Sequence, residues 1–405
     1  MKHLPLAALS VLALAATACG SGFEDKPSAA PQSSGPVSLR VLIASSGDSE
    51  TAAVKQAAEA WAKSSGNQAE VTPAQDIHQQ LGQAFAGGTP PDVFYVDAAR
   101  FADYASVGAL EPYADKISNP DDFYPSLRTT FTRDGKFYCA PKDFSTLALI
   151  VNDDLWKKAG AEIPTTWEQL TSAAEKLKAK GITPLALGDT RDRMGAFMVQ
   201  AGGWITSPDG TKATADSPEN LQALEYVQKL VKEKLAQSPK QLGADWSGAA
   251  FGEGKAAMTI EGNWIKGALK ADHPDLKYSV HELPAGAKKG TLSFTNCWGI
   301  AAKSANKAAA ISFVEAMTKA DQQLTFAKAF GVMPSRQSAK DGYVKEFPGD
   351  TAFVNGADYA QGPVNAAKMD SVLSDFDAQL QQLASKDPKT ILARLQKNTQ
   401  SALGE

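Results

Sequence analysis

Polar side chains that could hold a ligand gather in loops directly after expected strands. Ser46, Asp48 and Glu50 follow one such strand, and Asp97 directly follows another. Loops past the carboxyl ends of strands form the ligand sites of open α/β sheets, where these oxygens can form hydrogen bonds. The same residue types also cap the N-termini of helices, so the sequence leaves both roles open at each position.

The spacings that mark metal sites and catalytic nucleophiles are missing from the chain. His3 lies in the N-terminal segment, and His78, His273 and His281 are isolated, so none has a metal-ligand spacing. No CxxC, HExxH, GxSxG or Walker motif occurs, nor a dinucleotide-binding glycine motif between strand and helix. This pattern favours binding over catalysis, and we expect neither enzymatic activity nor a cofactor.

Strands and helices alternate along most of the chain, which predicts an α/β fold. Apolar and β-branched runs predict strands at 37–44, 68–72, 92–96, 144–151, 183–187, 256–260, 276–281 and 295–301. Helix formers and caps predict helices at 51–62, 77–86, from 153, and at 165–180, 218–236, 305–318, 320–330, 369–385 and 388–403. Thr165 and Glu168 have the spacing of a capping box at one of these starts.

Composition narrows the class of protein further. The net charge is −4 with 41 basic and 45 acidic residues, and no basic run occurs, so nucleic acid is not an expected partner. Three cysteines in 405 residues exclude a disulfide-dense scaffold. Residues 37–405 are long enough for two domains.

The N-terminus reads as an export signal. Lys2 precedes an apolar run, residues 4–15, which is shorter than the roughly 20 residues that span a bilayer. Small residues then end at Cys19, which resembles the lipobox of bacterial lipoproteins, although Ala16 stands where that pattern usually has Leu. The resemblance implies a signal peptide at 1–18, a lipidated Cys19 and a chain held at the extracellular face of the membrane. Residues 19–36 are a flexible tether in this interpretation, and an ordinary signal peptide is the alternative.

A series of blocks then occurs in a fixed order. They are Gly88–Asp97, Gly108–Tyr113, Phe137–Asp143, Ile150–Trp156, Ile163–Leu170, Gly254–Met258, Glu261–Trp264, Asn296–Ala301 and Phe330–Arg336. Their order resembles the extracellular solute-binding proteins of ABC importers, in the branch that binds sugars and oligosaccharides. The resemblance runs from about residue 38 to residue 400.

This resemblance implies a two-lobe periplasmic-binding-protein-like fold of type II, with ligand bound in the cleft between the lobes. The chain would cross between lobes three times, near 139–144, 292–298 and 331–336. Lobe one would comprise 37–141 with 297–333, and lobe two 142–296 with 334–405.

A sugar needs aromatic rings for its C–H faces, and donors and acceptors for its hydroxyls. Trp264 is the expected stacking residue, and Gly262 before it lets the backbone approach closely. Trp204 and Trp298 suit either the cleft or the core, and one of Arg191 or Arg193 could reach the cleft, as could Lys142. The full set of expected ligand contacts is Ser46, Asp48, Glu50, Asp97, Asp143, Phe144, Arg193, Trp204, Glu261, Asn263, Trp264, Asn296, Trp298 and Arg336.

Two cysteines remain if Cys19 carries lipid. Cys139 and Cys297 lie in segments assigned to adjacent crossings, and the oxidising compartment outside the cell permits a bridge. We expect a disulfide between them, and two buried free thiols are the alternative.

The expected function is capture of an extracellular di- or oligosaccharide by lobe closure, followed by delivery to a membrane permease. The protein would act as a monomer with a lipid anchor. A peptide or polyamine ligand, a sensory receptor and a secreted glycoside hydrolase are the competing hypotheses; the hydrolase would need paired carboxylates in a catalytic block, which is not recognisable here.

Overall fold

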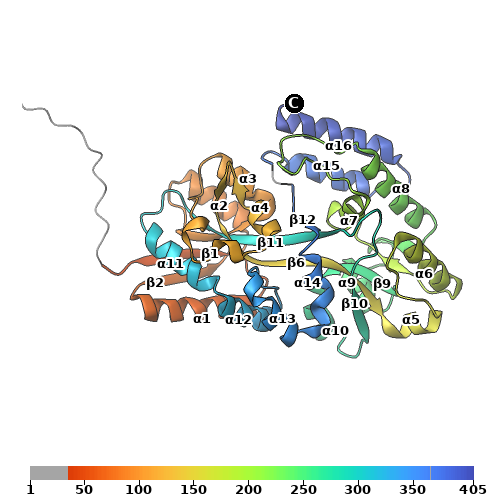
Figure 1. The fold of residues 1–405 in the computed structure, drawn as a ribbon, viewed down its shortest axis with the longest axis horizontal. Helices are drawn as coiled ribbons and strands as arrows, with labels where there is room; N and C mark the ends of the chain where they lie inside the picture. Colours follow the sequence, from red (N-terminus) through yellow and green to blue (C-terminus); the bar gives the residue numbers. More distant parts are fainter. Residues whose placement is uncertain (1–34, 365) are drawn as a thin grey trace, which may run out of the picture. The chain divides into compact units, whose positions relative to one another are not determined.

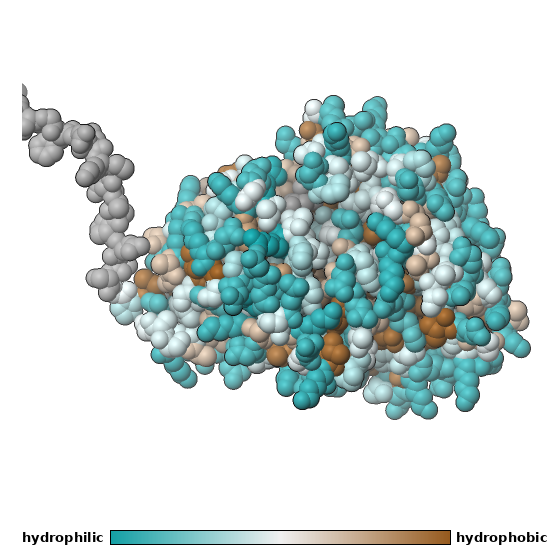
Figure 2. All heavy atoms as spheres, in the orientation of Figure 1, coloured by the Kyte–Doolittle hydropathy of each residue, from teal (hydrophilic) through white to brown (hydrophobic). Residues whose placement is uncertain are grey.

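The computed structural model describes residues 35–364 and 366–405. The predicted signal peptide, Cys19 and most of the predicted tether lie outside these residues. Within them, no helix combines the length and the apolar character needed to cross a membrane. On the face drawn in Figure 2, hydrophobic residues form small separate patches among hydrophilic ones.

One mixed sheet organises the chain, in the strand order β2-β1-β3-β11-β6-β9-β7-β8. β1, β2 and β3 pair in parallel, whereas β11 is antiparallel to both β3 and β6. The bounds are β1 Ser38–Ile43, β2 Gln68–Pro73, β3 Val93–Asp97, β6 Ala140–Asn152, β7 Leu185–Ala186, β8 Ala236–Gln237, β9 Met258–Gly262 and β11 Thr291–Ile300. β10 Tyr278–His281 pairs with β6, β12 Ala360–Gln361 pairs with β11, and β4 Thr132–Arg133 and β5 Lys136–Phe137 form a separate hairpin.

Two long strands, β6 and β11, join the two halves of this sheet. Figure 1 shows them running from the helices around β1 to those around β9. All thirteen residues of β6 are buried, as expected for a strand covered on both faces. A third segment runs alongside, because Met333 bridges to Phe144 of β6. The junction of the two halves is the stretch in which residues 140–146 of β6 pair with residues 293–298 of β11.

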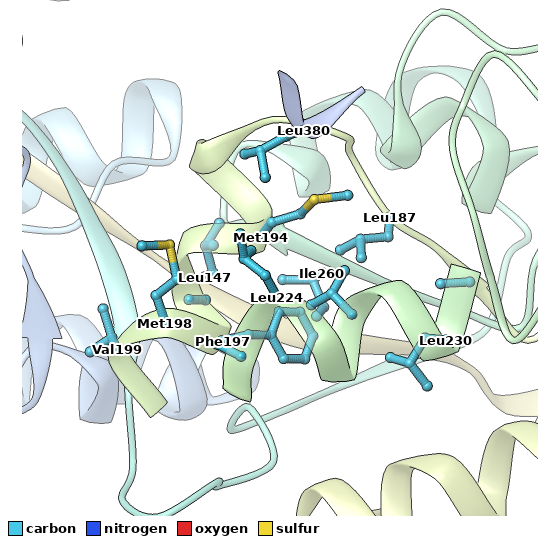
Figure 3. Close-up of a cluster of buried hydrophobic side chains, with 14 of the residues drawn as sticks. Leu147, Leu187, Met194, Phe197, Met198, Val199, Leu224, Leu230, Ile260 and Leu380 are labelled. Carbon is cyan, nitrogen blue, oxygen red and sulfur yellow. The ribbon is translucent and has the colours of Figure 1, made fainter. Parts of the chain in front are cut away.

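Helices cover both halves and bury separate hydrophobic cores. One core gathers β1, β3 and the helices beside them, including Val41, Phe94 and Phe313. Figure 3 shows part of a second core, in which Leu147, Phe197 and Leu224 from β6, α7 and α8 pack together. A third cluster includes residues of the late helices α13 and α14. The longer helices are α1 Asp48–Ser65, α2 Ile77–Ala86, α3 Ala98–Ser106, α6 Trp167–Ala179, α7 Arg191–Ala201, α8 Pro218–Lys232, α10 Ile265–Asp272, α11 Lys307–Met317, α12 Ala320–Phe330, α15 Asp370–Leu380 and α16 Pro388–Leu403; the shorter are α4 Pro125–Thr130, α5 Asp153–Ala159, α9 Ser247–Gly252, α13 Lys340–Glu346 and α14 Thr351–Gly356.

The predicted α/β order is confirmed, with local differences. The capping box is wrong by one residue: Thr166 accepts from the backbone N–H of Gln169, and the Gln169 side chain returns to the N–H of Thr165. No helix was predicted between residues 181 and 217, but Arg191–Ala201 form α7. Both long strands begin earlier than predicted, because polar residues that face the cavity described next hide their strand pattern.

Candidate functional site

A cavity of about 470 Å³ opens where β6 and β11 join the two halves of the sheet. Its walls come from the start of α3, from β6 and β11, from the loop after β9, and from the segment after β12. The polar and aromatic side chains that line it are Ser46, Glu50, Asp97, Lys142, Asp143, Phe144, Ser145, Arg191, Asp192, Trp204, Asn263, Trp264, Ser293, Phe294, Thr295, Asn296, Phe330 and Gln361.

Three polar residues form a row across adjacent strands in the wall of this cavity. Asn296 of β11 is in register with Asp97 of β3 on one side and with Asp143 of β6 on the other. Directly opposite residues of an antiparallel pair share a sheet face. The ladder between β11 and β6 changes register just after Asn296, so the row ends at a bulge. Two carboxyl groups and an amide thus face the same space.

A buried ion cluster stands behind this row. Nζ of Lys142 lies 2.8 Å from Oε1 of Glu50 and forms a second ion pair with Asp143. Tyr95 donates its hydroxyl to Oε1 of Glu50 at 3.1 Å, and both the backbone N–H and the hydroxyl of Ser46 donate to Oε2. The Lys142 ammonium also lies 4.7 Å from the centre of the Tyr95 ring.

Opposing effects set the pKa values in this cluster. Burial alone would raise the pKa of Glu50, but the charge of Lys142 and hydrogen bonds from Lys142 and Ser46 hold it below its ordinary value. Burial raises the pKa of Asp143, and Lys142 only partly offsets that effect. Burial would lower the pKa of Lys142, yet its two carboxylate partners raise it. The ammonium is therefore held charged between the two acids.

Aromatic rings line the same cavity. Trp264 is 39% exposed and packs edge-on against Phe294, with ring centres 5.2 Å apart. Trp204 lines the cavity and also packs against the core that contains Leu147, so both roles that the sequence left open apply. A Cβ at Gly262 would lie 2.2 Å from the Trp264 ring, so the glycine makes room for that ring.

A second cavity, of about 790 Å³, adjoins the first. Trp264, Phe330, Glu50 and Asn263 line both. Asp48 lines only the second among these two cavities. The amide of Asn263 donates to the backbone oxygen of Gly331 at 2.9 Å and its oxygen accepts from Ser145, so it ties the loop after β9 to two crossing segments.

Four expected ligand contacts lie outside both cavity walls. Glu261 is fully buried and accepts hydrogen bonds from Arg193 and Trp264, which places the acid and the arginine behind the tryptophan. Trp298 is fully buried in the core around β3. Arg336 is buried, and its guanidinium donates to the backbone oxygens of Thr318, Asn119 and Ser118.

Sequence reasoning left the choice between Arg191 and Arg193 open, and it missed two aromatic residues that line the first cavity. Arg191, rather than Arg193, reaches the wall, where it forms an ion pair with Asp377 of α15. Phe294 and Phe330 were not considered, although Phe294 lies two residues before Asn296 and so faces the same side of its strand. Strand alternation was the available signal, but the start of β11 was placed too late to apply it.

Cys139 and Cys297 form a disulfide, with Cα atoms 5.6 Å apart. Cys297 lies in β11 next to Asn296, and Cys139 directly precedes β6. The bridge therefore fastens the two long strands together beside the polar row. The described residues contain no group of three or more His, Cys, Asp or Glu side chains arranged to hold a metal ion.

Residues 45–324 match the family described as bacterial extracellular solute-binding proteins. The diacetylchitobiose binding protein DasA of Streptomyces coelicolor is 26% identical over 357 residues, which cover 84% of this chain and 83% of that protein. The solved structure of the GacH receptor of Streptomyces glaucescens is similar, with a TM-score of 0.78 and 24% identity over 91% of this chain and 99% of that one.

A cyclic alpha-maltosyl-1,6-maltose binding protein from Arthrobacter globiformis reaches a TM-score of 0.81 at 21% identity, with 91% of this chain and 99% of that one covered. These structural likenesses confirm the predicted two-lobe fold. The family match covers well over half of the 405 residues. The chain belongs to the bacterial extracellular solute-binding proteins.

Proposed function

We propose that this protein captures an extracellular di- or oligosaccharide between two lobes and delivers it to an ABC permease. Lobe one comprises 37–141 with 297–333, and lobe two 142–296 with 334–405. DasA is named for diacetylchitobiose, and the two similar structures are described with acarbose and as binding a cyclic maltosyl-maltose. These relatives support a carbohydrate ligand.

The row of Asp97, Asn296 and Asp143 beside the exposed ring of Trp264 carries the proposal. The row offers acceptors and an amide donor to hydroxyls, while the ring offers a flat apolar surface to C–H faces. A sugar is the ligand class that presents both surfaces together.

The two cations that line the cavity are both paired with carboxylates, which disfavours an anionic ligand. Lys142 is paired with Glu50 and Asp143, and Arg191 is paired with Asp377. An anionic solute would find both cations engaged, and a polyamine would compete with Lys142 for its carboxylates.

Capture requires closure, because a ligand shifts the lobes only if it binds the closed form more tightly than the open form. Binding involves no covalent chemistry in this proposal, and sugar release from an oligosaccharide would contradict it. A diacylated Cys19 would supply the two chains that stable membrane anchoring needs.

A thermal-shift screen of mono-, di- and oligosaccharides, with peptides and polyamines as comparison ligands, tests the ligand class. A bound ligand stabilises the folded state by RT ln(1 + [L]/Kd), so the matching sugar raises Tm in a concentration-dependent way. A Tm shift with peptides or polyamines, and none with any sugar, would overturn the proposal. Trp264→Ala should reduce the Tm shift caused by the sugar. Trp61→Phe should not, because Trp61 is buried in the core that contains Val41 and does not line the cavity.

A further inference from the structure

Trp264 is unusual among the large hydrophobic side chains of the described residues, because only it and Val107 are exposed. The indole lines both cavities. An exposed ring that must present a fixed surface to a ligand needs contacts that hold its orientation, since loss of rotamer freedom on binding weakens affinity. The structure supplies such contacts from behind the ring.

Glu261 is the centre of these contacts. It lies on β9, is fully buried, and accepts three hydrogen bonds. Trp264 Nε1 donates to Oε2 at 2.9 Å, Arg193 donates to the same oxygen at 2.6 Å, and Ser247 donates to Oε1 at 2.5 Å. The carboxylate thus ties the indole to Arg193 of α7 and to Ser247 of α9.

Arg193 braces the ring as well as the carboxylate. Its guanidinium carbon lies 5.3 Å from the centre of the Trp264 ring and 6.0 Å from that of Phe294. A guanidinium over an aromatic face is attractive. With the ring edge-on to Phe294 and close over Gly262, the indole is held by a hydrogen bond, a cation and two packing surfaces.

We infer that Glu261 and Arg193 are positioning residues, which fix Trp264 as a preformed platform in the cleft without themselves touching the ligand. This inference rests on the proposed function for its affinity test, but not for its structural test. It reassigns two residues that the sequence predicted as ligand contacts, and it explains why a fully buried carboxylate is placed beside the cleft.

The structural test uses ligand-free protein. The contribution of Trp264 to fluorescence is the difference between each variant and the same variant with Trp264→Phe. Glu261→Ala should increase acrylamide quenching of that contribution and shift its emission, because the indole loses its acceptor. Glu261→Gln should largely restore the wild-type signal, because its amide oxygen still accepts from Trp264. An unchanged Trp264 signal in Glu261→Ala would overturn the inference.

The affinity test is a double-mutant cycle on the sugar identified by the screen. Glu261→Ala should weaken binding by about tenfold in the wild-type background, because the loss of a charge-assisted hydrogen bond releases the ring. In the Trp264→Ala background the same change should weaken binding by less than about twofold, since residues that act through one another are not additive. Equal losses in both backgrounds would show that Glu261 acts on the ligand by another route.

Asp92→Asn is the matched control. Asp92 is a buried carboxylate that also accepts three hydrogen bonds, from Arg40, Ser304 and Asn306, but it lines neither cavity. The Asp92→Asn substitution should lower stability without changing the Trp264 fluorescence signal or the sugar affinity. If the wild-type protein binds no sugar, the proposed function fails, while the quenching experiment still decides whether Glu261 positions the ring.

Discussion

Nζ of Lys142 lies 2.8 Å from Oε1 of Glu50, a buried contact between residues 92 positions apart in the chain. Glu50 belongs to α1, and Lys142 lies near the start of β6. The contact therefore joins the first helix to the strand that carries Asp143 into the cavity, and it does so with charges that are almost entirely removed from water. Such a pair is sensitive to the loss of one partner.

Lys142→Met should strongly destabilise the protein. The change leaves the carboxylates of Glu50 and Asp143 buried without their cation, which costs about 3–5 kcal/mol for a broken buried pair. Urea unfolding followed by circular dichroism would show the lower midpoint. Adding Glu50→Gln to Lys142→Met should recover part of the loss, because one uncompensated charge is removed. A midpoint equal to that of the wild type would mean that the cluster adds nothing to stability.

The lowered pKa of Glu50 predicts an acid-side loss of stability. Burial opposes ionisation of this group, but Lys142 and Ser46 more than offset it, so the folded-state pKa lies below the unfolded value of about 4.3. A carboxyl with a lowered pKa stabilises the fold above its unfolded pKa, and the contribution is lost as pH falls through the folded pKa. The stability difference between wild type and Glu50→Gln should therefore shrink below about pH 4.3.

The pKa values of Asp143 and Lys142 are raised, unlike that of Glu50, so their effects on stability depend on pH differently. Because burial raises the pKa of Asp143, its ionised form costs stability at neutral pH. The stability difference between wild type and Asp143→Asn should therefore become smaller as pH falls. The raised pKa of Lys142 gives a contribution that is complete below about pH 10.4 and is lost above it. If the stability difference between wild type and Glu50→Gln stays constant between about pH 7 and about pH 3, the pKa of Glu50 is not lowered in the folded protein.

The disulfide should stabilise the two long strands. Cys139 and Cys297 are fully buried and 158 residues apart, and a native bridge typically contributes about 2–4 kcal/mol. In a chain carrying Cys19→Ser, the double change Cys139→Ala and Cys297→Ala should lower Tm. A thiol assay on the unfolded, unreduced Cys19→Ser chain should find no free thiol; two thiols per chain would refute the bridge.

The alternation of strands and helices was predictable because it follows from local patterns of apolar and β-branched residues. Asp97 shows where that information ends. The sequence predicted that it directly follows a strand and serves as a helix cap or as a ligand contact, whereas it is the last residue of β3. The structure shows that its side chain accepts from the N–H of Ala99 at 2.7 Å and that the residue also lines the cavity.

Long-range pairing was the part that the sequence left undetermined. Asn296 lies between Asp97 and Asp143 only because β11 pairs with both β3 and β6, a register that no local pattern contains. Glu261 and Arg336 illustrate the same limit: Glu261 follows an expected strand and Arg336 lies at an expected crossing, but the partners of both are found in other elements. Nothing in their local sequence distinguishes a side chain that faces the ligand from one that holds another residue.

Contacts between α3 and the start of α15 should favour the closed form. Arg100 of α3 forms an ion pair with Asp370, and the backbone N–H of Lys368 donates to Asp103 at 2.9 Å. These groups belong to different lobes in the proposed division. The ion pair is about 40% exposed on both sides, so it contributes about 1 kcal/mol or less.

Arg100→Glu should therefore weaken sugar binding by about fivefold or less, and adding Asp370→Arg should restore affinity by re-forming the pair in reverse. Small-angle scattering of the ligand-free variants would report any shift toward an open form. A loss that persists in the double variant would mean that this ion pair does not stabilise the closed form.

Asp97→Ser separates capping from ligand binding. Serine caps helices about as well as aspartate, so α3 should keep its first turn and Tm should stay close to that of the wild type. The substitution removes the carboxylate from the row with Asn296, so sugar affinity should fall. Asp97→Ala loses both roles and should also lower stability by about 1 kcal/mol. Calorimetric titration together with Tm separates the outcomes, and Asp97→Ser with wild-type affinity would restrict Asp97 to capping α3.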